Sequence, residues 1–447
     1  MQKLFGTDGI RGTIGKNIDI FMIVKIAMAG GISFRKNSIT NKILVGKDTR
    51  KSGYMVENAI VSGLTAIGFD VIQIGPMPTP TVGFLTVNMR CDGGIMISAS
   101  HNPYQDNGIK FFNSKGQKLS FEQESDIESI FHNEKLLIES YASGKHIGSS
   151  KRIDDVIGRY IVHIKNSFPG HLTLNGIRVV IDTANGAGYK VAPQIFEELG
   201  AEVFIIHNKP NGTNINKNCG ALHHEDLANE VQKVRANVGI ALDGDADRLV
   251  VVDENGSKVD GDNLMASIAV YLKSINKLKN NTMISTIMSN NALKEYLISK
   301  DIKYFSSDVG DRFVTQLMKE KDVNFGGEES GHIIFSDYSS SGDGLLSALQ
   351  TMAILVSSDE VTSKALRKFV PFNRNTYNLP IQNKIPLEDI KELENIKNDL
   401  KSKNLYYLIR YSGTENLLRI LIEGDKTSSE LDDEMHHLVE FFKKTLA

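Results

Sequence analysis

The densest group of potential metal ligands in the sequence is three aspartates, Asp243, Asp245 and Asp247, at alternate positions. They follow the apolar run 238–242, whose length and composition predict a buried strand. Carboxylates spaced in this way on a loop provide hard oxygen ligands, which suit Mg²⁺. Because a magnesium ion held by carboxylates usually acts on phosphate, the pattern predicts phosphate chemistry at the end of this strand.

The same aspartates could instead begin a calcium-binding EF-hand, with Glu254 at the twelfth place. That loop needs glycine at its sixth place, where this sequence has Arg248. The next residues, 249–252, are β-formers, and Asn255-Gly256 predicts a hairpin turn. The EF-hand interpretation therefore fails.

A second candidate is Ser100, which follows the short apolar run 95–97 and has His101 beside it. Pro103 disfavours a helical conformation at Asn102, so the chain turns there. A serine on a tight loop after a buried strand could be a nucleophile or the carrier of a covalent group. Taken alone, a solvated turn is the commoner interpretation of such a motif. A phosphoryl group on Ser100, however, would supply the missing oxygen ligand for magnesium at the aspartates.

Two basic residues could serve the same chemistry. Arg11 is a fixed cation in segment 5–12, where three glycines leave backbone amides open to a ligand. A glycine-rich entry loop is the alternative interpretation of that segment. Lys110 lies within one loop length of Ser100, so it could act as an acid or base or hold a phosphate.

Segment 326–332 places two carboxylates, a hydroxyl and an imidazole between glycines. Such a set can hold sugar hydroxyls, and His332 could move a proton. A polar hairpin turn is the alternative interpretation.

Arg410 and Arg419 flank a segment with two hydroxyl side chains, between stretches that predict strands at 406–409 and 417–422. Guanidinium groups match phosphate oxygens, so this segment predicts an oxyanion site.

The elements that must position these residues alternate between strand, loop and helix. In the first part of the chain, the pattern predicts a strand at 43–45, a helix at 56–66 and a strand at 71–74. Helical spacing continues over 121–147, and 308–312 is predicted as a charged loop. The alternation favours layered α/β domains with functional loops at strand ends.

A chain of 447 residues suggests three or four domains. We place three α/β domains at 1–152, 153–256 and 257–368, and a C-terminal α+β domain at 369–447. They carry the serine, aspartate, sugar-binding and phosphate-binding loops in that order.

Composition excludes several classes of protein. With 41% apolar residues and a net charge of −3, the chain has no global basic field for nucleic acid or an anionic membrane. Its two cysteines, Cys91 and Cys219, argue against a disulfide framework and fit the cytoplasm. The N-terminus lacks the apolar core of a signal peptide, and no apolar run is long enough to predict a transmembrane helix.

Five loops match one pattern in one order across nearly the whole chain. They are Gly6–Gly12, Ser98–Pro103, Asp243–Arg248, Gly327–His332 and Arg410–Glu415. Together they resemble the α-D-phosphohexomutase superfamily. The resemblance implies a heart-shaped enzyme with a central active-site cleft, three similar mixed α/β domains and a smaller C-terminal α+β domain.

The resemblance also implies a role for each loop. Ser100 is similar to the serine that is phosphorylated in the active enzyme. The implied magnesium ligands are the Ser100 phosphate, Asp243, Asp245 and Asp247. The implied sugar-binding pair is Glu328 and Ser330.

Two further groups follow from the resemblance. The implied site for the non-reacting phosphate consists of Arg410, Ser412, Gly413, Thr414 and Arg419. The implied cationic and proton-moving shell around the reacting groups consists of Arg11, His101, Lys110, Arg248 and His332.

The reaction implied is an isomerisation in the glucosamine branch of the superfamily. Glucosamine 6-phosphate and glucosamine 1-phosphate would interconvert through phosphoserine and a bisphosphate, with one Mg²⁺ per site and priming by a hexose 1,6-bisphosphate. The product would feed UDP-N-acetylglucosamine and peptidoglycan synthesis. We expect sugar phosphates as partners, no nucleic acid or membrane, and a monomer or homodimer. The alternatives are an enzyme for glucose or mannose phosphates and a non-catalytic sugar-phosphate-binding protein.

The assignment to the glucosamine branch rests on Ala246 and on segments 97–100 and 214–220. These features indicate relatedness and not mechanism. The sequence also departs from the branch. Glu329 stands where an uncharged residue is usual, and we expect it to face solvent. Tyr411 and Asn416 replace prolines, which we expect to loosen the phosphate loop.

Overall fold

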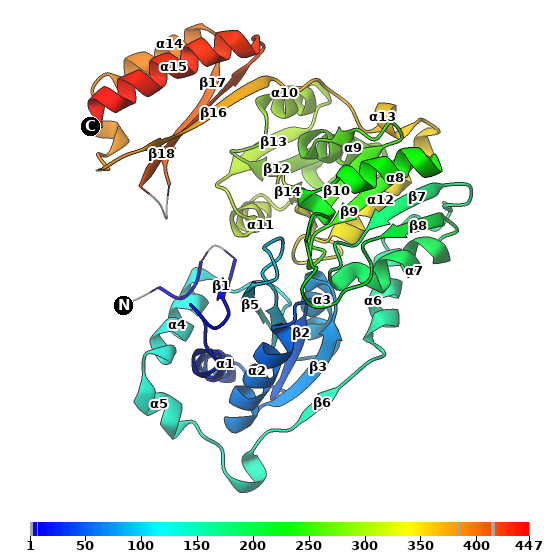
Figure 1. Cartoon of the computed structure of the whole chain (residues 1–447), viewed down its shortest axis with the longest axis vertical. Coiled ribbons are helices and arrows are strands. Elements are labelled where there is room, and N and C mark those ends of the chain that lie inside the picture. Colours follow the sequence, from blue (N-terminus) through cyan, green and yellow to red (C-terminus); the bar gives the residue numbers. More distant parts are fainter. Residues whose placement is uncertain (1–2, 7, 383, 413–415, 447) are drawn as a thin grey trace. The chain divides into compact units, whose positions relative to one another are not determined.

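The structure is a computed structural model that describes residues 3–6, 8–382, 384–412 and 416–446. The chain forms two compact units (Figure 1). The first unit consists of Met1–Thr286 and Phe305–Arg367. The second consists of Ile287–Tyr304 and Lys368–Ala447. Among the described residues, no helix has the length and apolar character needed to cross a membrane.

The first unit begins with a mixed six-stranded sheet. In sheet order its strands are β1 (Ile10–Thr13), β5 (Asp106–Asn113), β4 (Gly93–Ile97), β2 (Lys42–Lys47), β3 (Asp70–Pro76) and β6 (Ser150–Arg152). Its helices are α1 (Ile20–Arg35), α2 (Gly53–Ala66), α3 (Thr79–Asn88), α4 (Phe121–Phe131) and α5 (Glu134–Glu139). Strands β2, β3, β4 and β6 run parallel, and β1 and β5 complete the sheet in antiparallel pairs.

Helices cover both faces of this sheet. Neighbouring residues of β4 point to opposite sides, and each side meets a different helix. A Cβ built on Gly93 would lie 2.6 Å from the Phe34 ring of α1, and one on Gly94 would lie 2.3 Å from Thr86 Oγ1 of α3. The two glycines therefore let α1 and α3 approach closely. Strand β4 is buried throughout, so the loop after it is fixed on a rigid support.

The second sheet has five strands. In order they are β11 (Lys258–Val259), β10 (Leu249–Asp253), β9 (Val238–Leu242), β7 (Arg178–Asp182) and β8 (Glu202–Ile206). The helices of this region are α6 (Val156–Lys165), α7 (Val191–Glu198) and α8 (Glu225–Val234). Because β7, β8 and β9 are parallel, their carboxyl ends lie at one edge. The predicted β10–β11 hairpin is confirmed.

The third sheet has the strand order β13 (Lys303–Ser307), β12 (Thr282–Thr286), β14 (Phe325–Gly327) and β15 (Ile333–Phe335). Helices α9 (Gly261–Ser274), α11 (Asp311–Glu320), α12 (Gly344–Ser358) and α13 (Thr362–Ala365) accompany it. Helix α12 begins at Asp343, whose carboxylate caps the helix and also accepts a hydrogen bond from Tyr160 of α6 at 2.8 Å.

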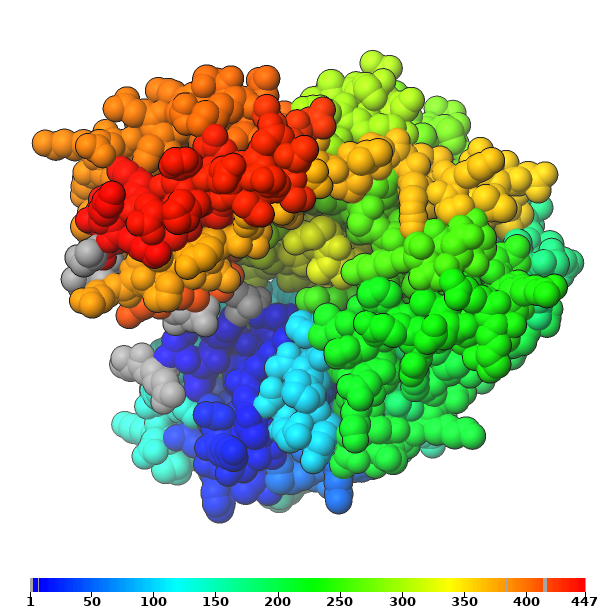
Figure 2. Space-filling model, turned by 45° about the horizontal axis from the view of Figure 1, so that its top comes forward, coloured from blue at the N-terminus to red at the C-terminus, as the bar shows by residue number. Residues whose placement is uncertain are grey.

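Elements of the first unit that are far apart in sequence lie side by side. Figure 2 shows the blue and cyan surface of the first sheet's elements against the green surface of residues 200–240. Consistent with this view, Lys51 N donates to Gly212 O at 2.8 Å.

The second unit contains an antiparallel sheet in the order β16 (Asn373–Pro380), β18 (Leu417–Gly424) and β17 (Tyr406–Tyr411). Its helices are α10 (Asn291–Ser299), α14 (Leu393–Ser402) and α15 (Ser428–Thr445). Leu418, Ile420 and Ile422 of β18 share a buried core with Leu431 and Leu438 of α15. Short 3₁₀ turns occur in the chain at Gly144–His146, Ala187–Tyr189, Gly220–Leu222, Lys279–Asn281 and Leu387–Asp389.

Some sequence-based boundaries are corrected. Lys110 lies inside β5, where residues 107–112 form a buried strand paired with β4. Asp311 and Arg312, predicted on a charged loop, open α11 after Gly310, whose φ of 123° only glycine adopts readily. Arg410 belongs to β17, which extends to Tyr411.

The predicted helical stretch 121–147 is divided into shorter elements. Helix α4 begins with a capping box at Ser120 and Gln123 and ends at Phe131. Asn133 then caps the short helix α5, which ends at Glu139. Local side-chain caps therefore divide a stretch whose charge pattern alone is continuous.

Candidate active site

Ser100 lies on the turn after β4, with its side chain aimed at the aspartate loop. It is buried, and its φ of 51° is in the left-handed region, which a non-glycine residue rarely adopts. Its Oγ donates to Asp243 Oδ2 at 2.6 Å and lies 3.4 Å from His101 Nδ1. The structure thus brings the predicted nucleophile directly to the predicted metal ligands.

The serine turn is held by Arg50, which the sequence did not single out. Arg50 is fully buried, and its guanidinium donates to Ser100 O at 2.8 Å and to Asn102 O at 2.9 Å. Its Nε donates to Asp48 Oδ2 at 2.8 Å, which neutralises the charge. Asn216 Nδ2 also donates to Ser100 O at 2.8 Å. A buried arginine and a distant asparagine therefore fix the main chain around the serine.

The three aspartates follow β9 and face one another. One oxygen from each lies within 4.8 Å of the others. Asp243 Oδ1 accepts hydrogen bonds from the backbone N–H groups of Asp247 at 3.1 Å and Arg248 at 3.2 Å, which closes the loop. A Cβ at Gly244 would lie 2.6 Å from Ser100 O, so this loop packs onto the serine turn only with glycine.

The aspartate group suits a cation. Asp245 Oδ1 and Asp247 Oδ1 are buried and have no hydrogen-bond partner among the described residues. Burial, followed by the neighbouring charges of Asp247 and Asp245, raises the pKa of Asp243 well above its ordinary value. A divalent cation would relieve that repulsion and satisfy the two oxygens. The residues present therefore fit a magnesium ion.

Lys110 and Thr79 bind the aspartate group from the first sheet's side. Lys110 Nζ lies 2.8 Å from Asp245 Oδ2 and 3.5 Å from Asp247 Oδ2. Thr79 Oγ1 donates to Asp245 Oδ2 at 2.6 Å. Burial alone would lower the pKa of Lys110, but Asp245, Asp8 and Asp247 raise it, so the lysine is a permanent cation here.

The charges continue away from Lys110 in alternating sign. Lys110 Nζ lies 3.1 Å from Asp8 Oδ2, and Asp8 also pairs with Lys118. Lys118 Nζ lies 2.6 Å from Asp311 Oδ2, which in turn lies 3.4 Å from His332 Nε2. These pairs link the first sheet to the start of α11 and to the β15 hairpin.

His332 returns the chain of charges to the aspartates, since its Nδ1 lies 3.7 Å from Asp247 Oδ1. Its Nε2 lies between Asp311 Oδ2 and the backbone N–H of Gly342 at 3.1 Å. Burial opposes a charge on the ring, but Asp247 and Asp311 outweigh it and raise the pKa of His332 to about 10. The two carboxylates therefore favour the protonated form of His332.

His101 is the opposite case. Burial, together with the positive charges of Arg248 and Arg11, lowers the pKa of His101 to about 4. The imidazole next to Ser100 Oγ is therefore neutral near pH 7 and can accept a proton.

Arg11 and Arg248 add positive charge at the same site. Arg11 pairs with Asp8, and Arg248 Nε lies 4.0 Å from Asp247 Oδ1. The Nε atoms of both arginines are buried without a hydrogen-bond partner among the described residues. Buried donors of this kind suit the oxygens of a phosphate.

Glu328 and Ser330 occupy the turn between the antiparallel strands β14 and β15. Both residues are half-buried, and Glu328 Oε1 accepts a hydrogen bond from Gly310 N at 3.0 Å. Burial raises the pKa of Glu328, with His332 opposing that effect. Glu329, expected in solvent, is half-buried instead, and its Oε2 accepts from Thr286 Oγ1 at 3.3 Å.

The predicted phosphate-binding residues belong to the second unit. Arg410 of β17 and Arg419 of β18 are directly paired across the antiparallel strands. Like charges at such a position repel each other, and an anion would relieve the repulsion. Ser412 is buried next to them, whereas Gly413 and Thr414 lie outside the described residues.

The two departures in this segment make local contacts. Tyr411 OH donates to Ile385 O at 2.5 Å, and Asn416 O accepts from Ile381 N at 3.0 Å. They attach the ends of the phosphate segment to the chain that follows β16.

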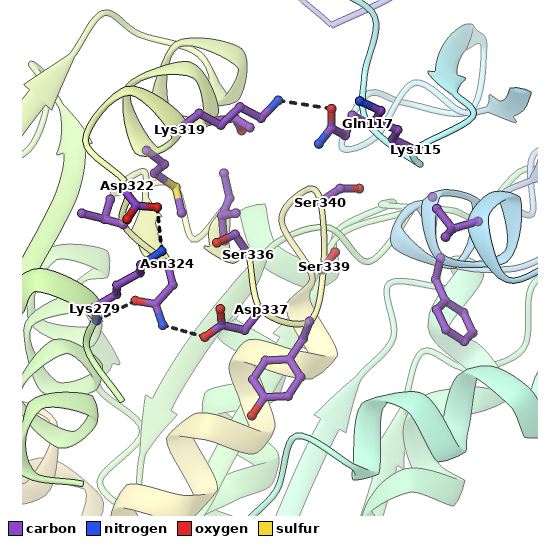
Figure 3. Close-up of a pocket in the computed structure, with 18 of the residues that line it drawn as sticks. Lys115, Gln117, Lys279, Lys319, Asp322, Asn324, Ser336, Asp337, Ser339 and Ser340 are labelled. Atoms are coloured by element: carbon purple, nitrogen blue, oxygen red, sulfur yellow. Dashed lines mark hydrogen bonds and ion pairs between the residues drawn. The ribbon is translucent and has the colours of Figure 1, made fainter. Parts of the chain in front are cut away.

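A separate pocket of about 580 Å³ lies in the first unit near α3 and α11. Figure 3 shows that its polar side chains face one another: Lys319 contacts Gln117 at 3.3 Å and Asn324 contacts Asp337 at 2.6 Å. None of the predicted catalytic residues lines it. This pocket is therefore separate from the residues around Ser100 and the three aspartates.

Comparison with protein families gives four matches in order along the chain. They carry the description phosphoglucomutase/phosphomannomutase: alpha/beta/alpha domain I at residues 2–137, domain II at 158–256, domain III at 260–372 and the C-terminal domain at 378–441.

Full-length relatives are also found. A phosphoglucosamine mutase of Aliarcobacter butzleri is 58% identical over 100% of both chains, and one of Helicobacter pylori is 57% identical over 99% of both. A solved phosphoglucomutase/phosphomannomutase family protein from Burkholderia thailandensis has a TM-score of 0.83 at 22% identity, covering 100% of this chain and 99% of that one. Aspergillus fumigatus N-acetylphosphoglucosamine mutase, solved with GlcNAc-6P and magnesium, has a TM-score of 0.67 at 16% identity, covering 99% and 96%. These likenesses confirm the expected four-domain α/β architecture.

Proposed function

The chain belongs to the phosphoglucosamine mutases of the phosphohexomutase superfamily, and on this premise we propose that Ser100 carries the phosphoryl group that it transfers. The reaction interconverts glucosamine 6-phosphate and glucosamine 1-phosphate. The observation that carries the proposal is the 2.6 Å contact between Ser100 Oγ and Asp243 Oδ2, in a buried group of three carboxylates.

The proposed cycle has two transfers. In the first, the P–O bond to Ser100 Oγ breaks and a P–O bond to the free hydroxyl of the sugar monophosphate forms, while that hydroxyl loses its proton and Ser100 Oγ takes one. The resulting bisphosphate reorients in the site. In the second transfer, its other phosphoryl group returns to Ser100 Oγ, which loses its proton, and the released sugar oxygen takes a proton. Atoms and charge balance over the cycle, and a hexose 1,6-bisphosphate primes the first turnover.

The two histidines supply complementary proton states. His101 is neutral, lies 3.4 Å from Ser100 Oγ and can accept the hydroxyl proton. Asp247 and Asp311 favour the protonated form of His332, which can return a proton or stabilise negative charge. Lys110, Arg11 and Arg248 hold the oxygens of the transferring group, because phosphoryl transfer depends on positioning and charge neutralisation.

Asp243, Asp245 and Asp247 would hold one Mg²⁺, together with an oxygen of the Ser100 phosphate. When bound, the ion supplies charge neutralisation for phosphoryl transfer. The two buried carboxylate oxygens without hydrogen-bond partners support this assignment.

Two groups of residues are proposed to contact the substrate. Glu328 and Ser330 would bind sugar hydroxyls, and the half-buried carboxylate of Glu329 could attract the ammonium group of glucosamine. Arg410, Ser412, Gly413, Thr414 and Arg419 would hold the non-reacting phosphate. The register pairing of Arg410 with Arg419 supports an anion site there.

The remaining assignments are proposals of the same kind. The domains are 1–152, 153–256, 257–368 and 369–447. The boundary between residues 256 and 257 falls inside the β10–β11 hairpin. The enzyme acts in the cytoplasm, as a monomer or homodimer. Phosphorylated sugars are metabolised there, and its reducing conditions keep cysteines free.

The test is turnover of glucosamine 6-phosphate with magnesium and a trace of hexose bisphosphate, beside glucose and mannose phosphates. Ser100→Ala is compared with Ser114→Ala, which changes an exposed serine on the turn after β5. We expect turnover of the amino sugar, loss in Ser100→Ala and retention in Ser114→Ala. Preference for glucose or mannose phosphates would overturn the branch, and turnover by Ser100→Ala would overturn the mechanism.

A further inference from the structure

A second group of metal-binding side chains lies in the second sheet, apart from the aspartate triad. Asp182 ends β7, His207 follows β8, and Cys219 lies at the end of the loop that leaves β8. Because β7 and β8 are parallel neighbours, their carboxyl ends bring Asp182 and His207 to one edge. One ligand atom from each of the three residues lies within 4.8 Å of the others.

The three side chains are held at this edge by short contacts. His207 Nδ1 lies 3.0 Å from Asp182 Oδ2, which also accepts a hydrogen bond from Gly220 N at 2.8 Å. The second bond brings the residue next to Cys219 against the carboxylate. Asp182 and Cys219 are buried, whereas a quarter of the His207 side chain is exposed. The group is therefore closed on one side and reachable on the other.

The outer nitrogen of His207 is also engaged. Nε2 lies 3.2 Å from Asp226 Oδ2 at the start of α8. A carboxylate that accepts from one imidazole nitrogen fixes the ring and leaves the other nitrogen as the ligand, as in carboxylate–histidine–metal arrangements. Here that arrangement directs Nδ1 toward Asp182 and Cys219.

The donor set has a distinct chemistry. A carboxylate oxygen, an imidazole nitrogen and a thiolate sulfur together favour Zn²⁺ over Mg²⁺, because sulfur is a soft ligand. Without a cation, burial raises the pKa of Cys219 to about 12, so the thiol is protonated. Binding would release the Sγ proton and any proton on His207 Nδ1.

We propose that Asp182, His207 and Cys219 bind one thiophilic divalent cation of the Zn²⁺ type, with Asp226 orienting His207 and a water completing a tetrahedral shell. This site goes beyond the mutase reaction and does not depend on it. It is connected to the active site through the same loop, since Asn216, three residues before Cys219, donates to Ser100 O at 2.8 Å.

The test uses Co²⁺ as a spectroscopic probe on the full-length protein after chelation, with excess Mg²⁺ present to occupy the aspartate triad. We expect one equivalent of Co²⁺ to produce a thiolate-to-cobalt charge-transfer band, which Zn²⁺ then abolishes by displacement. Cobalt at the aspartate triad gives no such band because that group contains no sulfur.

Two cysteine variants form a matched pair, since Cys91 is the other cysteine of the sequence and is also buried. Cys219→Ser should lose the band, and Cys91→Ser should keep it. Asp226→Asn changes a largely exposed carboxylate, and we expect it to weaken Co²⁺ binding about ten-fold without loss of folding. Absence of the band in the wild type, its survival in Cys219→Ser, or unchanged affinity in Asp226→Asn would overturn the proposal.

Discussion

Ser100 Oγ lies 2.6 Å from Asp243 Oδ2, although the two residues follow strands of different sheets. The serine turn extends from β4, and the aspartate loop extends from β9. The contact therefore joins the proposed phosphoryl carrier to the proposed metal ligands only when both sheets are folded and packed.

Asp243→Asn should lower kcat by about 10²- to 10³-fold, because it removes a charge that would neutralise the cation next to the transferring phosphoryl group. Titration with Mg²⁺ under steady-state turnover measures both the maximal rate and the metal concentration required. Asp154→Asn is the control, since Asp154 is exposed. Normal magnesium dependence in Asp243→Asn would contradict the assignment.

Arg50→Lys should lower kcat about 10²-fold with a smaller change in KM, because a single ammonium group cannot reproduce the guanidinium bonds to Ser100 O and Asn102 O. The serine turn would then shift while the substrate contacts remain. Steady-state kinetics and thermal unfolding should be measured together, with the exposed Lys51→Gln as the control. Unchanged kcat in a folded Arg50→Lys variant would show that the turn does not need this support.

Asp343 should make unfolding depend on pH. Burial raises its pKa from 3.8 to about 6, so the unfolded chain releases this proton first and folding becomes less favourable as pH rises between these values. The shift corresponds to a loss of about 3 kcal/mol, complete above pH 6. Asp343→Asn keeps an oxygen for the N–H groups of Leu345 and Leu346 but cannot titrate.

Urea unfolding at pH 4 to 7 compares the two proteins. The difference in unfolding free energy between wild type and Asp343→Asn should change with pH and then level off near pH 6. Parallel curves would contradict the role assigned to Asp343.

Glu423→Gln should destabilise the second unit by about 1 to 3 kcal/mol, since it removes the charge of a buried carboxylate that pairs with the partly exposed Arg374. Glu423 Oε2 accepts from Arg374 Nε at 2.8 Å, and Oε1 accepts from Asn291 N at 2.7 Å, which attaches α10 to the sheet. Chemical unfolding measures the change in stability, and native-state hydrogen exchange in β16 and β18 measures where it occurs. Glu388→Gln, at an exposed position, is the control. Equal exchange rates in both variants would refute this prediction.

The sequence predicted the parts of the site that lie within single loops. Asp243, Asp245 and Asp247 are close in sequence, and the apolar run before them identifies the strand that presents them. Ser100 follows a similar run, and Glu328 lies in a recognisable turn. In each case a buried strand and a polar turn contain the information locally.

The supports of the site could not be predicted in this way. Arg50 and Asn216 reach Ser100 O from positions 50 and 116 residues away, so only the packed sheets bring them together. The link from Asp311 to His332 likewise depends on the start of α11, where the sequence predicts a charged loop at 308–312. Long-range contacts among charged residues leave no periodic pattern in the sequence.

The most direct test of the central claim is transfer from the isolated phosphoenzyme. The protein is first phosphorylated with a hexose 1,6-bisphosphate whose phosphate is labelled, and peptide mass shows that Ser100 carries the labelled phosphate. It is then mixed with glucosamine 6-phosphate and magnesium in a single turnover. We expect the label to leave Ser100 and to appear in the sugar bisphosphate at a rate no slower than steady-state turnover. Label that stays on the protein while unlabelled product accumulates would contradict the phosphoserine mechanism.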